Sequence, residues 1–276
     1  IMNKILFVTV NYKNTEITKN FIQSFENLEL KENASIVIVD NSSTSKSRES
    51  LKTISLKSSL DIKLIFSSKN LFYWGGANYA LKKLNLDINN FPDWIIICNN
   101  DIIFNKKDLI VKLQNIKSNN YAVIAPSILS VKSKQNQNPH ILSPISKLGR
   151  LYYNIFFINS VSGLFIYKLR IMLKNIINIY SNEKIIKPME IYAPHGSFMI
   201  FSKNFFSNGG WIDSNFEMFA EELTTAEIVK RLKMKIFFNP DFEVMHDEHL
   251  TSSSNSWTEN FHTFKRAYNY FQKEYL

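Results

Sequence analysis

The sequence predicts an α/β fold with a mostly parallel, doubly wound sheet and helices on both of its faces. Short apolar runs rich in β-branched residues lie at 5–10, 35–40, 62–66 and 94–98. Such runs are typical of parallel strands that are buried on both faces. Segments with helical spacing of apolar residues, such as 15–28 and 76–84, lie between them. Strands that alternate with helices in this way favour a doubly wound sheet.

The predicted strands end in polar residues. Asn11 follows the first run, Asp40 ends the second, and Asn100 and Asp101 follow the fourth. Because ligands of doubly wound sheets bind beyond the carboxyl ends of the strands, these side chains are candidates for a binding site. Asp40 could instead form a local turn, and Asp101 could cap the following segment.

The chain divides into three segments, at 1–126, 127–190 and 191–276. In the last segment we expect a strand at 197–201, a helix at 221–233 and a strand at 235–238, in the same α/β pattern. The middle segment interrupts this pattern, and we interpret it as a basic, apolar helical insertion.

Charge is concentrated in the insertion. The 276-residue chain has a net charge of +9, and residues 127–190 hold nine basic and two acidic side chains, a net of +7. The uncharged run Leu151–Tyr167 is interrupted by polar residues and is too short to indicate a transmembrane helix. We expect this segment to contact a membrane or a lipid-linked acceptor peripherally. Packing on the rest of the chain and a homodimer interface remain open alternatives.

Composition narrows the class of protein. Hydrophobic residues make up 45% of the chain, which excludes a disordered protein. Cys98 is the single cysteine, so a disulfide framework or a cysteine-rich zinc site is excluded. With no secretory signal at the start of the sequence, we expect a cytoplasmic protein at the inner face of the cell membrane.

Two further features carry possible chemistry. Glu221 and Glu222 open a predicted helix, where the helix dipole stabilises carboxylates and where one of them could act as a general base. His246 follows a predicted strand and could bind metal or phosphate, although a lone histidine is more often structural. The sequence contains neither a GxGxxG nor a GxxxxGK motif, which disfavours dehydrogenases and P-loop enzymes.

Taken in order, these pieces resemble the family-2 glycosyltransferases of GT-A fold, and especially their bacterial rhamnosyltransferase-like branch. The matching segments are 8–12, 38–43, Asn70 with 74–78, 98–101, 196–200, 209–213, 219–222, and 239–240 leading to His246. No single piece is specific, but the ordered set covers most of residues 4–126 and 193–253.

The resemblance implies roles for individual residues. Those that would bind the nucleotide sugar are Thr9, Asn11, Asp40, Asn70, Trp74, Gly76, Asn78 and Asn100. Asp101 and His246 would hold Mn²⁺ or Mg²⁺. Glu222 would be the catalytic base, with Glu221 as the alternative. The family's metal motif has more than one acid, whereas here it reads Asn99-Asn100-Asp101.

The predicted function is transfer of a hexose from a dTDP- or UDP-hexose to an acceptor hydroxyl, with inversion. The resemblance to the rhamnosyltransferase-like branch favours rhamnose as the sugar. The acceptor would be a saccharide or a lipid-linked saccharide of a bacterial surface polysaccharide such as capsule or lipopolysaccharide, and no nucleic acid would take part. Residues 1–126 would bind the donor and residues 191–276 the acceptor. The alternatives are a sugar nucleotidyltransferase and a noncatalytic module that binds polysaccharide or membrane.

Overall fold

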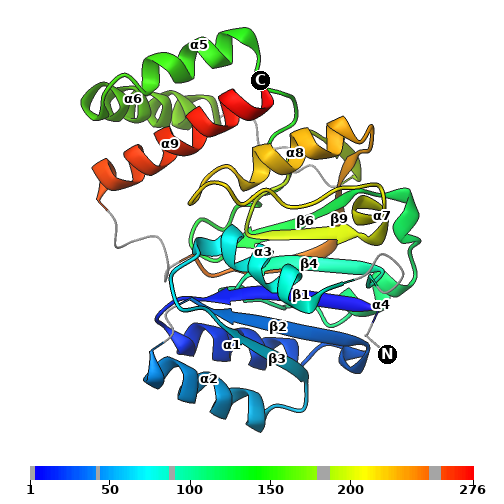
Figure 1. Ribbon diagram of the computed structural model, residues 1–276. Helices are drawn as coiled ribbons and strands as arrows, with labels where there is room; N and C mark the ends of the chain where they lie inside the picture. The colour runs from blue at the N-terminus through cyan, green and yellow to red at the C-terminus, as the bar shows by residue number, and fades with distance from the viewer. Residues whose placement is uncertain (1–3, 42–43, 87–90, 179–186, 249–255) are drawn as a thin grey trace.

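The computed structural model describes residues 4–41, 44–86, 91–178, 187–248 and 256–276 (Figure 1). Four parallel strands form its first half, in the order β3 (Asp61–Phe66), β2 (Ala34–Asp40), β1 (Ile5–Asn11) and β4 (Trp94–Asn99). Every residue of β1 is buried, as its continuous apolar run predicts. The four strands predicted in this half are confirmed.

The second half of the sheet is mixed. β8 (Phe198–Ser202) lies antiparallel between β4 and β6 (Val123–Ser130), and β9 (Ile236–His246) runs parallel to β6. The short strands β5 (Ile102–Ile103) and β7 (Met189–Ile191) pair antiparallel with β9. The sheet thus departs from the mostly parallel prediction beyond β4, because an apolar run reports burial and not strand direction.

Helices cover both faces of the sheet, as predicted (Figure 1). On one side lie α1 (Thr15–Phe25), α2 (Ser45–Lys57) and α4 (Leu109–Gln114). On the other side lie α3 (Phe72–Leu84), α7 (Lys203–Ser207) and α8 (Glu221–Arg231). Short 3₁₀ turns, η1 (Lys31–Asn33) and η3 (Ser118–Asn120), precede β2 and β6. The predicted α/β class, with helices on both faces of the sheet, is confirmed.

The insertion forms a helical layer with the last helix. α5 (Lys147–Phe156) and α6 (Ser160–Asn178) lie beside α9 (Trp257–Tyr275), away from β3 and α2 (Figure 1). Their contact is an aromatic cluster centred on Phe156, Phe157, Phe261 and Tyr268. The predicted helical insertion is therefore present, although residues 179–186 of it lie outside the described residues. Its predicted start after Pro126 falls inside β6, where the pairing with β9 shifts register.

None of the described helices is long and apolar enough to cross a bilayer, in keeping with the interpretation of Leu151–Tyr167.

Candidate active site at the sheet edge

The carboxyl ends of β1 and β2 carry a buried hydrogen-bonded network. Asn11 and Asp40 are register partners, and neither has exposed surface. Asn11 Nδ2 donates to Asp40 Oδ1 at 3.0 Å, and Ser47 Oγ of α2 donates to Asp40 Oδ2 at 2.9 Å. Both carboxylate oxygens of Asp40 are therefore held, as a buried carboxylate requires.

The network continues to Asn100 beyond β4. Thr18 Oγ1 donates to Asn11 Oδ1 at 2.8 Å and accepts from Asn100 Nδ2 at 2.9 Å. Thr9, two residues before Asn11 on β1, is also fully buried. Hydrogen bonds thus join Asn11, Asp40 and Asn100 through Thr18 and Ser47. The predicted contacts of Thr9, Asn11, Asp40 and Asn100 with a nucleotide stay predictions.

Asp101 and His246 come together from distant parts of the sequence. Asp101 follows β4, and His246 ends β9. Asp101 Oδ1 lies 3.1 Å from His246 Nε2, and the two side chains are only 1% and 8% exposed. On the other side of the ring, His246 Nδ1 lies 2.8 Å from Gln137 Oε1, and Gln137 Nε2 donates to Glu248 Oε1.

These contacts fix the orientation of the His246 ring. Because Glu248 engages the Gln137 amide nitrogen, the amide oxygen faces His246 and accepts its Nδ1 proton. Nε2 then faces Asp101 Oδ1, and an imidazole nitrogen and a carboxylate oxygen in this arrangement fit a divalent cation.

Asp101 and His246 supply only part of a metal shell. Among the described residues, no three His, Cys, Asp or Glu side chains form a group that could hold an ion by themselves. Mg²⁺ and Mn²⁺ commonly take one or two protein ligands and complete their shell with substrate phosphates and water. The pair therefore fits a metal that is bound together with a diphosphate.

Glu221 and Glu222 begin α8 and are half-buried. Ala220 N donates to Glu221 Oε2 at 3.0 Å, and Gly196 N donates to Glu222 Oε1 at 3.0 Å. A Cβ atom on Gly196 would lie 2.7 Å from Glu222 Oε1. The bare backbone at Gly196 therefore lets the Glu222 carboxyl approach the start of β8.

The pKa of both carboxyls is raised. For Glu221 burial is the main cause, and the negative charge of Glu222 adds to it; for Glu222 burial dominates. Backbone N–H groups oppose the shift in both cases, because they stabilise the charged form. Adjacent carboxyls with raised pKa are common at sites that transfer protons.

Tyr73 of α3 contacts the backbone that holds Glu222. Its hydroxyl donates to Gly196 O at 3.1 Å, next to the amide that binds Glu222. Burial raises the pKa of Tyr73 well above its usual value, and the charges of Cys98, Glu221, Glu222 and Asp101 raise it further. Asn99 N donates to Ser197 O at 2.9 Å, so Asp101 after β4 and Gly196 before β8 lie at the same end of two neighbouring strands.

The sequence model of glycosyl transferase family 2 matches residues 6–208, which is most of the chain. The chain belongs to glycosyl transferase family 2. The match covers the sheet from β1 through α7, including Asp101 and Gly196, and ends before Glu221.

One relative of this family-2 chain is named for glycan biosynthesis. The hexosyltransferase Agl10 of low-salt glycan biosynthesis from Haloferax volcanii is 27% identical over 241 residues, which are 86% of this chain and 64% of that protein. The chain thus spans somewhat less than two thirds of the length of this relative.

Solved structures share the fold. A mannosyltransferase from Pyrobaculum calidifontis, in complex with GDP-Man and Mn²⁺, superposes with a TM-score of 0.54 at 9% identity over 91% of this chain and 59% of that one. GalNAc-T7 with UDP, GalNAc and Mn²⁺ gives a TM-score of 0.59 at 13% identity over 99% and 49%.

The predicted donor-binding residues at 70–78, at and just before the start of α3, lie in several environments. Asn70 Oδ1 accepts from Phe72 N at 2.9 Å at the start of the helix. Trp74 is 1% exposed and packs in the core. A Cβ on Gly76 would lie 2.9 Å from Val10 Cγ2, so Gly76 lets α3 approach β1 closely.

Asn78 joins α3 to the loop that precedes α8. Its Nδ2 donates to Ser214 Oγ at 2.5 Å, and its Oδ1 accepts from Trp211 Nε1 at 2.8 Å. The predicted contacts of Asn70, Trp74, Gly76 and Asn78 with a donor sugar stay predictions.

Three residues of this site were absent from the sequence prediction. Tyr73 and His195 each lie beside a predicted motif, and their position next to Trp74 and Gly196 was the available signal. The His195 ring lies 6.0 Å from that of His246, and burial, followed by the charges of His140 and His246, lowers its pKa to about 3. Gln137 lies in a polar stretch and carries no sequence signal.

Proposed function

We propose that this chain transfers a hexose from a nucleotide-diphosphate sugar to an acceptor hydroxyl. Membership of family 2 supports the reaction class. The observation that carries the proposal is that the Asp101–His246 pair, beyond the end of β4, and Glu222, bonded to Gly196 before β8, lie at the same end of two neighbouring strands. Residues 1–126 bind the donor, and residues 191–276 supply the base and bind the acceptor.

Glu222 is the proposed base. It lies where α8 meets the start of β8, whereas Glu221 is bonded to the amides of its own turn. Glu222 takes the proton of the acceptor hydroxyl as the oxygen attacks the anomeric carbon, and the bond from that carbon to the diphosphate breaks. Attack opposite the leaving group inverts the anomeric centre, as the family resemblance implies. Glu221 is the alternative base.

Asp101 and His246 are the proposed ligands of Mn²⁺ or Mg²⁺. When bound, the metal neutralises the charge that grows on the departing diphosphate. Gln137 holds the His246 ring in the orientation that directs Nε2 toward Asp101. The Mn²⁺ present with two proteins of the same fold supports a divalent metal here.

The donor is proposed to be a dTDP- or UDP-hexose, and rhamnose follows from the branch resemblance. Nucleotide sugars or their parts accompany both fold neighbours, as GDP-Man and as UDP with GalNAc. A role in surface polysaccharide, capsule or lipopolysaccharide synthesis is a proposal that the glycan-synthesis relative supports only as a class.

The outer face of α5 and α6 is proposed to contact an anionic membrane surface. Leu148, Leu151 and Ile155 lie at helical spacing on α5 and are 79%, 55% and 46% exposed; Val161 and Phe165 on α6 are 77% and 69% exposed. Exposed Lys168 and Arg170 add positive charge. Apolar side chains with neighbouring bases are typical of interfacial helices.

A donor-binding experiment tests the proposed function. Nucleotide sugars are added to the protein with Mn²⁺, with Mg²⁺ or with EDTA, and thermal stability is followed, since a ligand of the folded state raises the melting temperature. One donor class should stabilise the protein only with metal, and His246→Gln should remove most of that shift. No stabilisation by any donor would contradict the proposal.

A further inference from the structure

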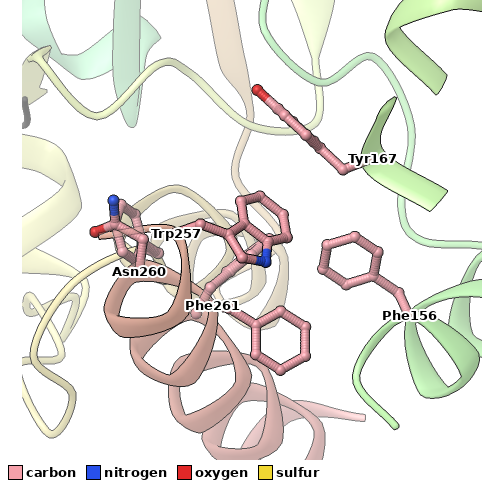
Figure 2. Close-up of a pocket in the computed structure, with 7 residues that line it drawn as sticks. Phe156, Tyr167, Trp257, Asn260 and Phe261 are labelled. Atoms are coloured by element: carbon pink, nitrogen blue, oxygen red, sulfur yellow. The ribbon is translucent and has the colours of Figure 1, made fainter. Parts of the chain in front are cut away.

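An apolar pocket of about 260 Å³ lies between the insertion and α9. Six of its seven lining residues are aromatic: Phe156, Tyr167, Phe219, Trp257, Phe261 and Phe264, with Asn260 as the seventh. Figure 2 shows Phe156 and Tyr167 reaching the pocket from α5 and α6, and Trp257 and Phe261 from α9. This lining suits an apolar ligand.

Phe219 links the pocket to Glu221, the neighbour of the proposed base. Its ring lies 5.8 Å from that of Phe264, while its backbone N–H is one of those that stabilise the Glu221 carboxylate. Phe219 has a φ of 74°, a left-handed conformation that is costly for an aromatic residue. Such strain persists where the surroundings hold it, and it is common at functional sites. The pocket wall is thus two residues from Glu221.

We propose that this pocket binds the hydrocarbon chain of a lipid-phosphate-linked acceptor, whose hydroxyl then lies at the Glu221–Glu222 pair. The proposal rests on the proposed function. Sugar hydroxyls buried against this aromatic lining would lose hydrogen bonds to water, whereas a hydrocarbon chain gains from leaving water. Pockets that enclose a whole drug-sized ligand measure about 300–1,000 Å³, so this one takes a segment of the chain.

The charge on the insertion side of the pocket complements a lipid phosphate. The sequence has no acidic residue between Asp108 and Glu183, a stretch that includes all of α5 and α6. Exposed Lys168 follows the pocket residue Tyr167 directly, and Arg170 lies two residues further on. A phosphate attached to a chain in the pocket can therefore reach a cationic surface.

Quenching of Trp257 fluorescence tests binding without any sugar transfer. Of the four tryptophans, Trp257 lines the pocket, Trp74 and Trp94 are each 1% exposed, and Trp211 lies outside the lining with its Nε1 bonded to Asn78 Oδ1. Dodecyl phosphate brominated along its chain should quench the wild-type protein, and inorganic phosphate should not. Trp257→Phe should lose most of the quenching. Equal quenching in Trp257→Phe would overturn the proposal.

A kinetic comparison tests the role of the pocket in catalysis. Two acceptors carry the same hexose phosphate, one on a dodecyl chain and one on a butyl chain. Asn260→Trp fills the pocket and should raise KM for the dodecyl acceptor at least about tenfold, leaving kcat and the butyl acceptor unchanged. Leu56→Ser, at an exposed position on α2, is the control that should change neither.

The remaining outcomes separate other occupants. An unchanged KM for the dodecyl acceptor would overturn the proposal. A KM raised for both acceptors in Asn260→Trp would also overturn it, because the pocket would then bind the sugar. So would loss of vesicle binding by Asn260→Trp without any change in KM, because the pocket would then contact the bilayer and not the acceptor. Nucleotide release with the butyl acceptor shows that the proposed function itself holds, so the two failures are distinguishable.

Discussion

The adjacent carboxyls of Glu221 and Glu222 make a specific prediction about stability. A carboxyl whose pKa is higher in the folded than in the unfolded protein binds protons more tightly when the protein is folded. Its contribution to the free energy of unfolding is therefore lost as the pH rises through its pKa in the folded protein. At pH 9, Glu221→Gln should therefore raise the melting temperature.

At pH 4, where the Glu221 carboxyl is mostly protonated in both the folded and the unfolded protein, the gain in melting temperature of the Glu221→Gln variant should shrink. Glu16→Gln, on the exposed first turn of α1, is the control. An equal gain at both pH values would mean that the Glu221 charge is not the cause.

The same pair predicts the pH dependence of transfer. A base acts only when deprotonated, so kcat/KM should rise with pH through an apparent pKa above the usual glutamate value of 4.5. Because the charges of Glu221 and Glu222 oppose each other's ionisation, Glu221→Gln should move this rise to lower pH. A rate profile of the variant that coincides with wild type would contradict the coupling.

At this scale the sequence predicted part of the site. The ordered motifs contained Asp101, His246 and Glu222, and the structure brings Asp101 to His246. Tyr73 was not predicted, because its role depends on the position of α3 over Gly196, and spacing in the sequence does not report that position.

Among the elements, α9 is anchored by one carboxylate. Tyr270 and Tyr275 each donate a hydroxyl to Asp213 Oδ2 at 2.6 Å, and Asp213 lies in the loop that leads to α8. Burial, followed by the hydrogen bond to Asp213, raises the pKa of Tyr270 to about 12. The tyrosines therefore stay protonated and keep donating in the physiological range.

Removing both hydroxyls should loosen α9. Tyr270→Phe with Tyr275→Phe deletes two hydrogen bonds to a charged group, each worth about 1 kcal/mol at a partly exposed site. Backbone hydrogen exchange in α9 should become faster, while exchange in β1 stays unchanged. Tyr12→Phe, on an exposed side chain after β1, is the control. Unchanged exchange in α9 would show that Asp213 does not anchor it.

The elements also differ in how far they could be predicted. The β1–β4 half follows from apolar runs, but β6 contains Pro126, which disfavours a strand in sequence reasoning. α2 buries only Ser47 and Leu51 and has a weak apolar face. α9 carried a usable signal that the prediction omitted: aromatic residues at spacings of three and four behind the Ser256–Glu259 capping box.

At the scale of the whole molecule, we expect reversible binding to anionic membranes through the outer face of α5 and α6. Leu148→Glu with Leu151→Glu should abolish flotation with vesicles containing phosphatidylserine at low salt. Lys168→Glu with Arg170→Glu should weaken flotation and reduce its salt dependence, because each base near such a surface contributes about 1 kcal/mol.

Leu56→Glu is the matched control for this prediction. Leu56 is 86% exposed on α2, at the opposite end of the molecule (Figure 1), and its replacement adds the same charge as either of the two changes on α5 made singly. If Leu56→Glu reduces flotation as much as the α5 variants, the surface assignment is wrong. Conversion of a dimer to a monomer by the α5 variants, with flotation unchanged, would instead identify the face as a homodimer interface.

Sugar transfer by the purified chain is the most direct test of the central claim. Release of nucleoside diphosphate from the stabilising donor would be measured with acceptor, for wild type, Glu222→Gln and Glu221→Gln. We expect metal-dependent turnover that falls by a factor of about 10²–10⁴ in Glu222→Gln, while donor binding is retained. The loss of turnover in Glu221→Gln should be smaller. Wild-type rates in Glu222→Gln, or full turnover in EDTA, would contradict it.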